Sequence, residues 1–281
     1  MAFFFRHSIC NEVFDKWNFA DGCRAIRKAG YTGIEIAHFT LAEDPQQISA
    51  GQRREYRDIM ASEGLEFVGL HWLMVSPKGL HVTTPDNALR ERSWNHIRSL
   101  IDLCADLGPG GILVFGSPAQ RRSTGGSTRA ESTRRWVDGF GSVAAQAAER
   151  GVTILVEALP SADSDVCNTV AEAVSIVQEL NSPAIRTMFD SHNAADETEP
   201  HAAIVDRYFD YIRHVHVNEM DGRYPGTGDY DFRSLFEVLQ RRNYSGWVSL
   251  EVFDFKPGPV AIAERSLRYL ESQIASMAQT A

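Results

Sequence analysis

The sequence has few cysteines and no long apolar stretch. Its four cysteines, Cys10, Cys23, Cys104 and Cys167, are scattered and form no CxxC pair. This argues against a zinc ribbon or a disulfide framework and suits a reducing compartment. No window approaches about 18 apolar residues, so we expect no membrane span. The first residues, MAFFFRHSIC, lack the basic region and the apolar length of a signal peptide, and we expect a cytoplasmic protein.

The chain also has fewer basic than acidic residues. The chain has 28 lysines and arginines against 37 aspartates and glutamates, and its formal net charge is -9. A protein with this balance has no overall positive field with which to displace counterions from a nucleic-acid backbone. We therefore expect no nucleic-acid partner.

What the sequence does contain is a regular alternation of short apolar runs and longer amphipathic segments. The 281 residues can bury a sizeable core without disulfides. The apolar runs predict strands at residues 3–9, 33–36, 65–70, 111–115, 153–156, 185–189, 212–217 and 246–250. The amphipathic segments predict helices at residues 19–29, 51–63, 87–107, 128–150, 169–180, 201–209, 232–242 and 259–277.

This pattern of strand–helix units predicts an α/β fold, a (β/α)8 TIM barrel that forms a single domain over residues 1–281. Runs such as ILVF and TILV are almost wholly apolar, as expected of parallel strands that are covered on both faces. The alternative is an open, doubly wound sheet, which commonly has a glycine-rich first turn. The first turn here, SICNEVFDKW, carries no GxGxxG, so the barrel is favoured.

Polar residues stand where the predicted strands end, at the rim on which barrel active sites lie. Glu35 and His71 belong to the first half, and strands five to eight deliver Glu157, Asp190, His216 and Glu251 in succession. Three carboxylates and an imidazole in one barrel mouth require raised pKa values or a cation among them. Such a set suits one divalent metal ion, Mn²⁺ or Mg²⁺ before Co²⁺ or Zn²⁺. The alternative is that each acid only caps the helix after its strand.

Five motifs resemble the sugar isomerase/epimerase family with the xylose-isomerase-like barrel, and in particular the ketose 3-epimerases of the tagatose/psicose kind. They are VEAL at 156–159, FDSHN at 189–193, HVHVNE at 214–219, GRYPGTGD at 222–229 and SLEVF at 249–253. The resemblance covers essentially the whole chain. It implies that Glu157, Asp190, His216 and Glu251 hold the metal, and that both glutamates also act as the catalytic acid/base pair on opposite faces of the substrate.

The resemblance also implies that His192 and Arg223 hold the substrate. The sequence departs from the family here in two ways. The family histidine commonly follows the aspartate by three residues, whereas His192 follows Asp190 by two. A second glutamate that those epimerases carry a turn after the first is absent, and Asp163 is the nearest acid.

Three further side chains are candidates for binding substrate from the loops after strands three and four. We expect His71 and Trp72 to bind sugar hydroxyls and a sugar face. Arg121, in the stretch GSPAQRRSTGG, could clamp a phosphate or a carboxylate, or belong to a solvated loop.

The function expected from these residues is divalent-metal-dependent isomerisation or epimerisation of a free or phosphorylated keto sugar. The proton would move between the two glutamates through a metal-stabilised enediolate. The alternatives are a dehydratase or lyase on a polyol or keto-sugar scaffold, a barrel that only binds sugar, and an endonuclease-IV-like DNA-repair enzyme. The acidic balance counts against the last of these. The expected partner is a small carbohydrate, and barrels of this kind often form homo-oligomers.

Overall fold

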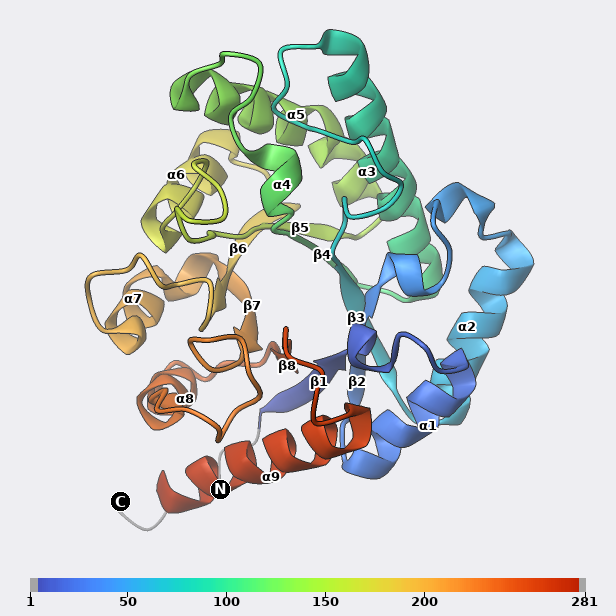
Figure 1. Ribbon diagram of the computed structural model, residues 1–281, viewed down its shortest axis with the longest axis vertical. Helices are drawn as coiled ribbons and strands as arrows, with labels where there is room; N and C mark the ends of the chain where they lie inside the picture. Colours follow the sequence, from blue (N-terminus) through green and yellow to red (C-terminus); the bar gives the residue numbers. More distant parts are fainter. Residues whose placement is uncertain (1–4, 278–281) are drawn as a thin grey trace.

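Parallel strands close into a barrel in chain order, because β1 pairs with both β2 and β8 (Figure 1). This is seen in a computed structural model that describes residues 5–277. The strands are β1 (Arg6–Cys10), β2 (Gly33–Ala37), β3 (Glu66–His71), β4 (Ile112–Phe115), β5 (Thr153–Val156), β6 (Ile185–Asp190), β7 (Ile212–Val217) and β8 (Trp247–Leu250). Closure confirms the predicted (β/α)8 barrel and excludes the open sheet. One domain over residues 1–281 stays a prediction.

Helices surround the barrel on its outside (Figure 1). They are α1 (Phe19–Ala29), α2 (Ala50–Ser62), α3 (Asn87–Leu107), α5 (Arg129–Glu149), α6 (Val170–Leu180), α7 (His201–Tyr208), α8 (Phe232–Arg241) and α9 (Pro259–Met277). The short helix α4 (Pro118–Arg121) lies inside this ring, near the ends of β4 and β5 (Figure 1). Short 3-10 turns add η1 (Asn11–Phe14), η2 (His38–Thr40), η3 (Pro45–Gln47) and η4 (Phe209–Tyr211). No helix among residues 5–277 is long and apolar enough to cross a membrane.

The helices begin where the sequence supplies capping side chains. The Asn18 side chain accepts a hydrogen bond from the backbone amide of Ala20 at the start of α1. The Asp86 side chain accepts one from the amide of Ala88 at the start of α3. Ser49 and Thr128 form capping boxes at the starts of α2 and α5. These local signals explain why most of the predicted helix ends lie within one or two residues of the observed ones.

Two differences from the prediction concern the first strand and a short helix. The first strand was expected at residues 3–9, and the structure begins β1 at Arg6; residues 3 and 4 lie outside the described part of the chain. The helix α4 was not predicted, because four residues are too few to show a helical period.

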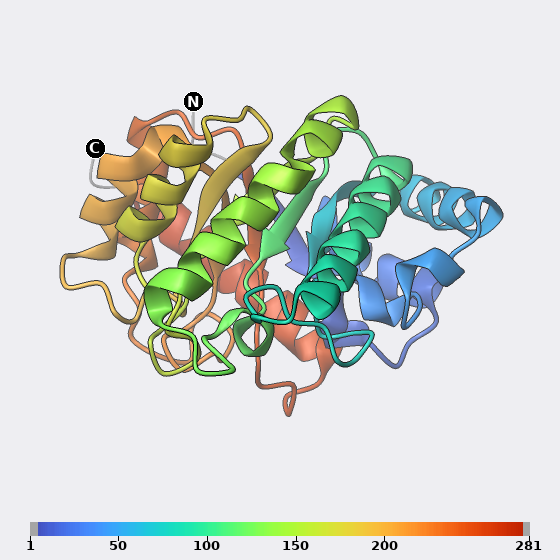
Figure 2. The ribbon, with the colours of Figure 1, turned by 90° about the horizontal axis from the view of Figure 1, so that it is seen from above.

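The long loops that follow the strands gather at one edge of the barrel. Figure 2 shows the loops after β3 and β4 at the lower edge, together with the loop after β8. The core between the strands and the outer helices includes Phe115, whose ring packs edge to face against Trp136 and Phe140. A rigid apolar wall thus holds the carboxyl ends of the strands in place.

Candidate active site

The second half of the barrel brings four polar side chains to one place. Asp190 ends β6 and His216 lies in β7, and these two residues pair directly in the sheet. Glu157 follows β5 and Glu251 follows β8 without an intervening residue. All four are buried, and each offers a ligand atom within 4.8 Å of the others. We refer to Glu157, Asp190, His216 and Glu251 as the ligand cluster.

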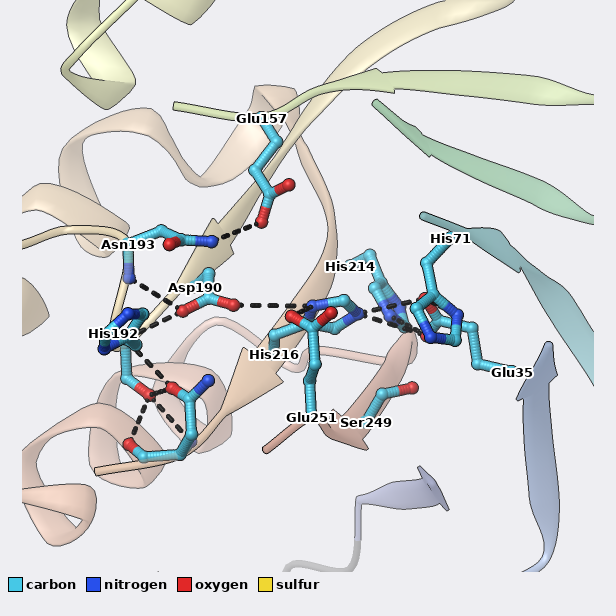
Figure 3. A network of polar contacts seen from close by, with 12 residues as sticks. Glu35, His71, Glu157, Asp190, His192, Asn193, His214, His216, Ser249 and Glu251 are labelled. Atoms are coloured by element: carbon cyan, nitrogen blue, oxygen red, sulfur yellow. Dashed lines mark hydrogen bonds and ion pairs between the residues drawn. The ribbon is translucent and has the colours of Figure 1, made fainter. Parts of the chain in front are cut away.

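The distances within the ligand cluster match those between neighbouring ligands of one metal ion. His216 Nδ1 lies 3.0 Å from Glu251 Oε2 and 3.4 Å from Asp190 Oδ2 (Figure 3). Two ligands that each lie about 2.1 Å from a shared ion stand roughly 3 Å apart in an octahedral arrangement. A divalent ion could therefore be held with little movement of these side chains.

The backbone of the next loop fixes the orientation of Asp190. Its Oδ1 accepts hydrogen bonds from the amides of His192 and Asn193, at 2.7 and 2.9 Å. Its Oδ2 is buried and has no hydrogen-bond partner. A buried carboxylate oxygen without a donor is costly, and a cation would satisfy it. The residues present therefore fit a divalent metal ion.

Glu157 is held on both sides. Its Oε1 accepts a hydrogen bond of 2.9 Å from Asn193 Nδ2. On the other side stands Gly116, where an added Cβ would lie only 2.2 Å from Glu157 Oε2. Any side chain at residue 116 would clash with the Glu157 carboxylate, so the site requires glycine there.

Burial and mutual repulsion change the proton affinities of the ligand cluster. Burial, with the nearby charges of Asp190 and Glu251, raises the pKa of Glu157 to about 8. Burial also raises the pKa of Glu251. Burial opposes ionisation of Asp190, but the nearby imidazole of His216 outweighs it and lowers the pKa of that carboxyl. Without a metal ion, the cluster therefore holds protons that a cation would displace.

A second group of buried charges lies behind His216, and the sequence did not reveal it as a network. Glu35, in β2, accepts from His214 Nε2 at 2.8 Å and from His216 Nε2 at 3.0 Å (Figure 3). Glu12, in η1, lies 2.7 Å from His71 Nε2. The signals in the sequence were the positions of Glu35 and His71 on their strands and the alternation in β7, which places His214 and His216 on one face.

A cavity of about 290 Å³ opens above the ligand cluster. Glu157 and Glu251 line it, together with His71 and Trp72 from the end of β3. Phe253 adds an aromatic wall, because its ring meets Trp72 edge to face at 6.2 Å. A carbohydrate could place polar groups on the glutamates and an apolar face on these rings.

Comparison with known proteins identifies the family. A model of the family described as "Xylose isomerase-like TIM barrel" matches residues 23–273. The chain belongs to that family. This finding confirms the family inferred from the motifs.

Curated relatives of this xylose isomerase-like barrel carry the names of sugar epimerases, which are isomerase-class enzymes. The L-ribulose 3-epimerase of Methylomonas sp. (strain DH-1) is 27% identical over 84% of this chain and 80% of its own length. The 3-dehydro-D-guloside 4-epimerase of Escherichia coli (strain K12) is 25% identical over 86% and 89%. A crystal structure of D-psicose 3-epimerase in the presence of D-fructose shares the fold, with a TM-score of 0.83 and 18% identity, and covers 96% of this chain and 99% of that one.

Arg121 is the predicted substrate-binding residue that the structure places elsewhere. Its side chain is fully buried and donates to the carbonyls of Glu157, at 2.6 Å, and Cys167, at 3.1 Å. Its guanidinium also lies 4.6 Å from the ring of Trp136. Arg121 therefore does not line the cavity and is not part of a solvated loop, because its two terminal nitrogens donate to buried backbone carbonyls. It supports the backbone of Glu157.

The other predicted substrate contacts divide into two groups. His71, Trp72 and His192 line the cavity, and the His192 ring packs against Phe253 at 5.1 Å. Arg223 does not line it: the side chain is exposed and pairs with Asp221 at 2.7 Å. Among residues 5–277, no lysine or arginine lines this cavity.

Proposed function

We propose that this protein is a divalent-metal-dependent epimerase of a keto sugar. The observation that carries the proposal is the ligand cluster at the floor of a cavity, with two glutamates that reach it from β5 and β8. The family membership and the names of the relatives support sugar epimerisation. The cluster supports the metal, for which Mn²⁺ and Mg²⁺ are the first candidates because three of the four ligands are carboxylates.

In the proposed reaction Glu157 and Glu251 move the proton. One carboxylate removes the hydrogen from the carbon beside the substrate carbonyl, and the product is an enediolate. The other glutamate returns a proton from the opposite face and inverts the centre. The two side chains suit opposite faces because β6 and β7 separate the strands that carry them.

The remaining groups have supporting roles in this proposal. When bound, the metal ion would polarise the substrate carbonyl and stabilise the negative charge that develops there. Asn193 holds one oxygen of Glu157, and so directs the other towards the cavity. His71 and His192 can hydrogen-bond sugar hydroxyls, while Trp72 and Phe253 cover the apolar face.

The cavity favours an uncharged sugar over a phosphorylated one. The side chains that line it include the acids Asp163 and Asp221, and no lysine or arginine lines it in the described part of the chain. A phosphate group would meet the negative charge of these acids and would find no guanidinium or ammonium group to pair with. The relatives differ in the carbon at which they are named to act, C3 or C4. The panel that tests the proposal therefore includes free ketoses and 3-keto-glycosides.

Deuterium exchange tests the proposal. Purified protein with excess Mn²⁺ is incubated in D₂O with each sugar, and products are followed by NMR. We expect an epimer that carries deuterium at the inverted carbon, and Glu157→Gln and Glu251→Gln should abolish its formation. A dehydrated product would favour the lyase alternative. Binding of sugar without exchange or conversion would contradict catalysis altogether.

A further inference from the structure

Glu35 is a buried carboxylate with no access to the cavity described above. It lies in the middle of β2 and is fully buried. Its two oxygens are shared between His214 Nε2 and His216 Nε2, and His71 Nδ1 lies 3.5 Å away. A charged group at this depth is stable only where donors surround it. One of its partners, His216, belongs to the ligand cluster.

His216 stands between two sets of carboxylates. Its Nδ1 faces Asp190 and Glu251, whereas its Nε2 faces Glu35 (Figure 3). A neutral imidazole carries a hydrogen on one nitrogen and a lone pair on the other. Whichever nitrogen donates a hydrogen bond leaves the opposite nitrogen free to bind a metal ion.

We propose that Glu35 is a positioning residue for the metal site, a role that rests on the metal-dependent function proposed above. Its carboxylate accepts the Nε2–H of His216 and so keeps the Nδ1 lone pair directed at the point that Asp190 and Glu251 share. A carboxylate behind a metal-binding imidazole fixes the orientation of the ring and strengthens the ligand.

The surroundings of Glu35 hold it in this orientation. His214 occupies the second carboxylate oxygen at 2.8 Å, which prevents the carboxylate from turning away from His216. The contact also crosses the interior of the barrel, because β1 and β8 lie between β2 and β7. Only the closed barrel brings Glu35 to His216, and it does so at Nε2, the nitrogen that faces away from Asp190 and Glu251.

A purely structural role for Glu35 makes different predictions. If Glu35 served only to satisfy two buried histidines, its replacement would lower the stability of the metal-free protein and leave metal affinity unchanged. A positioning role requires that metal affinity falls. The two roles therefore separate when affinity is measured on folded protein.

The first test compares Mn²⁺ binding by isothermal titration calorimetry for wild type and Glu35→Gln, with folding checked by circular dichroism. We expect affinity to fall about 10- to 100-fold, the usual cost of losing such a partner. Glu219→Gln is the matched control. Glu219 is 1% exposed and accepts backbone hydrogen bonds from Gly226 and Tyr230, outside the ligand cluster. Its replacement should leave Mn²⁺ affinity unchanged.

The second test uses the wild-type protein, so it remains decisive if Glu35→Gln does not fold. Protein labelled with ¹⁵N-histidine and loaded with Zn²⁺ is examined by NMR, with the signals of His216 identified by their loss in His216→Gln. We expect Nδ1 to be the metal-bound nitrogen and Nε2 to carry a hydrogen. A metal-bound Nε2, or an unchanged affinity in folded Glu35→Gln, would overturn the positioning role. If wild type binds no divalent ion, the proposed metal site fails, and this role fails with it.

Discussion

The two halves of the barrel differ in how many imidazoles accompany their buried carboxylates. The acids of the first half are matched by imidazoles: Glu12 meets His71, and Glu35 meets His214, which β7 of the second half supplies. In the second half, three carboxylates share one imidazole, His216, whose other nitrogen is already occupied by Glu35.

The difference bears on where the proposed metal ion would bind. The Glu12–His71 contact of 2.7 Å is a direct hydrogen bond that joins one acid to one imidazole, and Glu12 Oε1 and His71 Nδ1 have no hydrogen-bond partner. In the ligand cluster three carboxylates share one imidazole, and burial together with the charges of Asp190 and Glu251 raises the pKa of Glu157. Buried acids that imidazoles balance can be stable without metal, whereas the unbalanced cluster favours a divalent ion.

The largest expected effect concerns the two glutamates of the second half. Glu251→Gln and Glu157→Gln should each lower kcat by about 10² to 10⁴-fold, because general acid–base groups commonly contribute that much. Glu237→Gln, an exposed residue of α8 paired with Arg233, is the control. Steady-state assays on a converted sugar provide the measurement. Near-wild-type turnover in both cavity variants, with metal still bound, would place the chemistry in other residues.

The second prediction tests whether only the second half holds metal. Asp190→Asn should weaken Mn²⁺ binding by about tenfold or more, since even an outer partner of a ligand contributes that much. Asp163→Asn, which lines the cavity outside the ligand cluster, should leave affinity unchanged. Glu12→Gln should leave the stoichiometry of bound Mn²⁺ unchanged. A lost equivalent of metal in Glu12→Gln would show that the first half also binds an ion.

The same contrast separates the site residues that the sequence predicts from those that it does not. Glu157, Asp190 and Glu251 each end an apolar strand, so the barrel pattern alone predicted that they meet. Glu35 also belongs to a predicted strand, but its contact with His216 joins residues 181 positions apart and needs the closed barrel. No local pattern indicates such a contact.

Arg121 shows a second limit of the sequence. Arginine in a polar loop suggests an anion site, but the acceptors here are the backbone carbonyls of Glu157 and Cys167, which belong to another loop. Every residue has a backbone carbonyl, so the sequence does not show which carbonyls accept hydrogen bonds from a side chain. Whether such a side chain lines a cavity or supports its wall is therefore decided by the packing of the loops.

Arg121→Met should reveal this supporting role as a loss of stability. The variant leaves buried carbonyls without donors, and we expect the free energy of unfolding to fall by about 3 kcal/mol. Arg121→Lys keeps the charge but not the planar set of N–H donors. Its free energy of unfolding should therefore lie between those of Arg121→Met and wild type. Urea denaturation measures both. A stable methionine variant with a raised KM only for sugar phosphates would restore the phosphate clamp.

A fourth prediction follows from the pKa of about 8 at Glu157, raised from 4.5. Between these values the folded metal-free protein keeps a proton that the unfolded chain has lost. Its stability should therefore fall as pH rises from about 4.5 to 8. Thermal unfolding across this range measures the slope. Excess Mn²⁺ should flatten it, and Glu157→Gln should remove most of it. An unchanged slope in Glu157→Gln would assign the pH dependence to other groups.

The smallest expected effect concerns the aromatic wall that joins the two halves. Phe253, from the loop after β8, packs on Trp72 from the end of β3 and on His192. A ring contact of this kind contributes about 0.5–1.5 kcal/mol, so Phe253→Ala should raise KM roughly two- to tenfold and leave kcat unchanged. Phe255→Ala is the control, because Phe255 is exposed in the same loop and does not line the cavity. A fall in kcat without a change in KM would show that the wall orients the reacting carbon rather than binding the sugar.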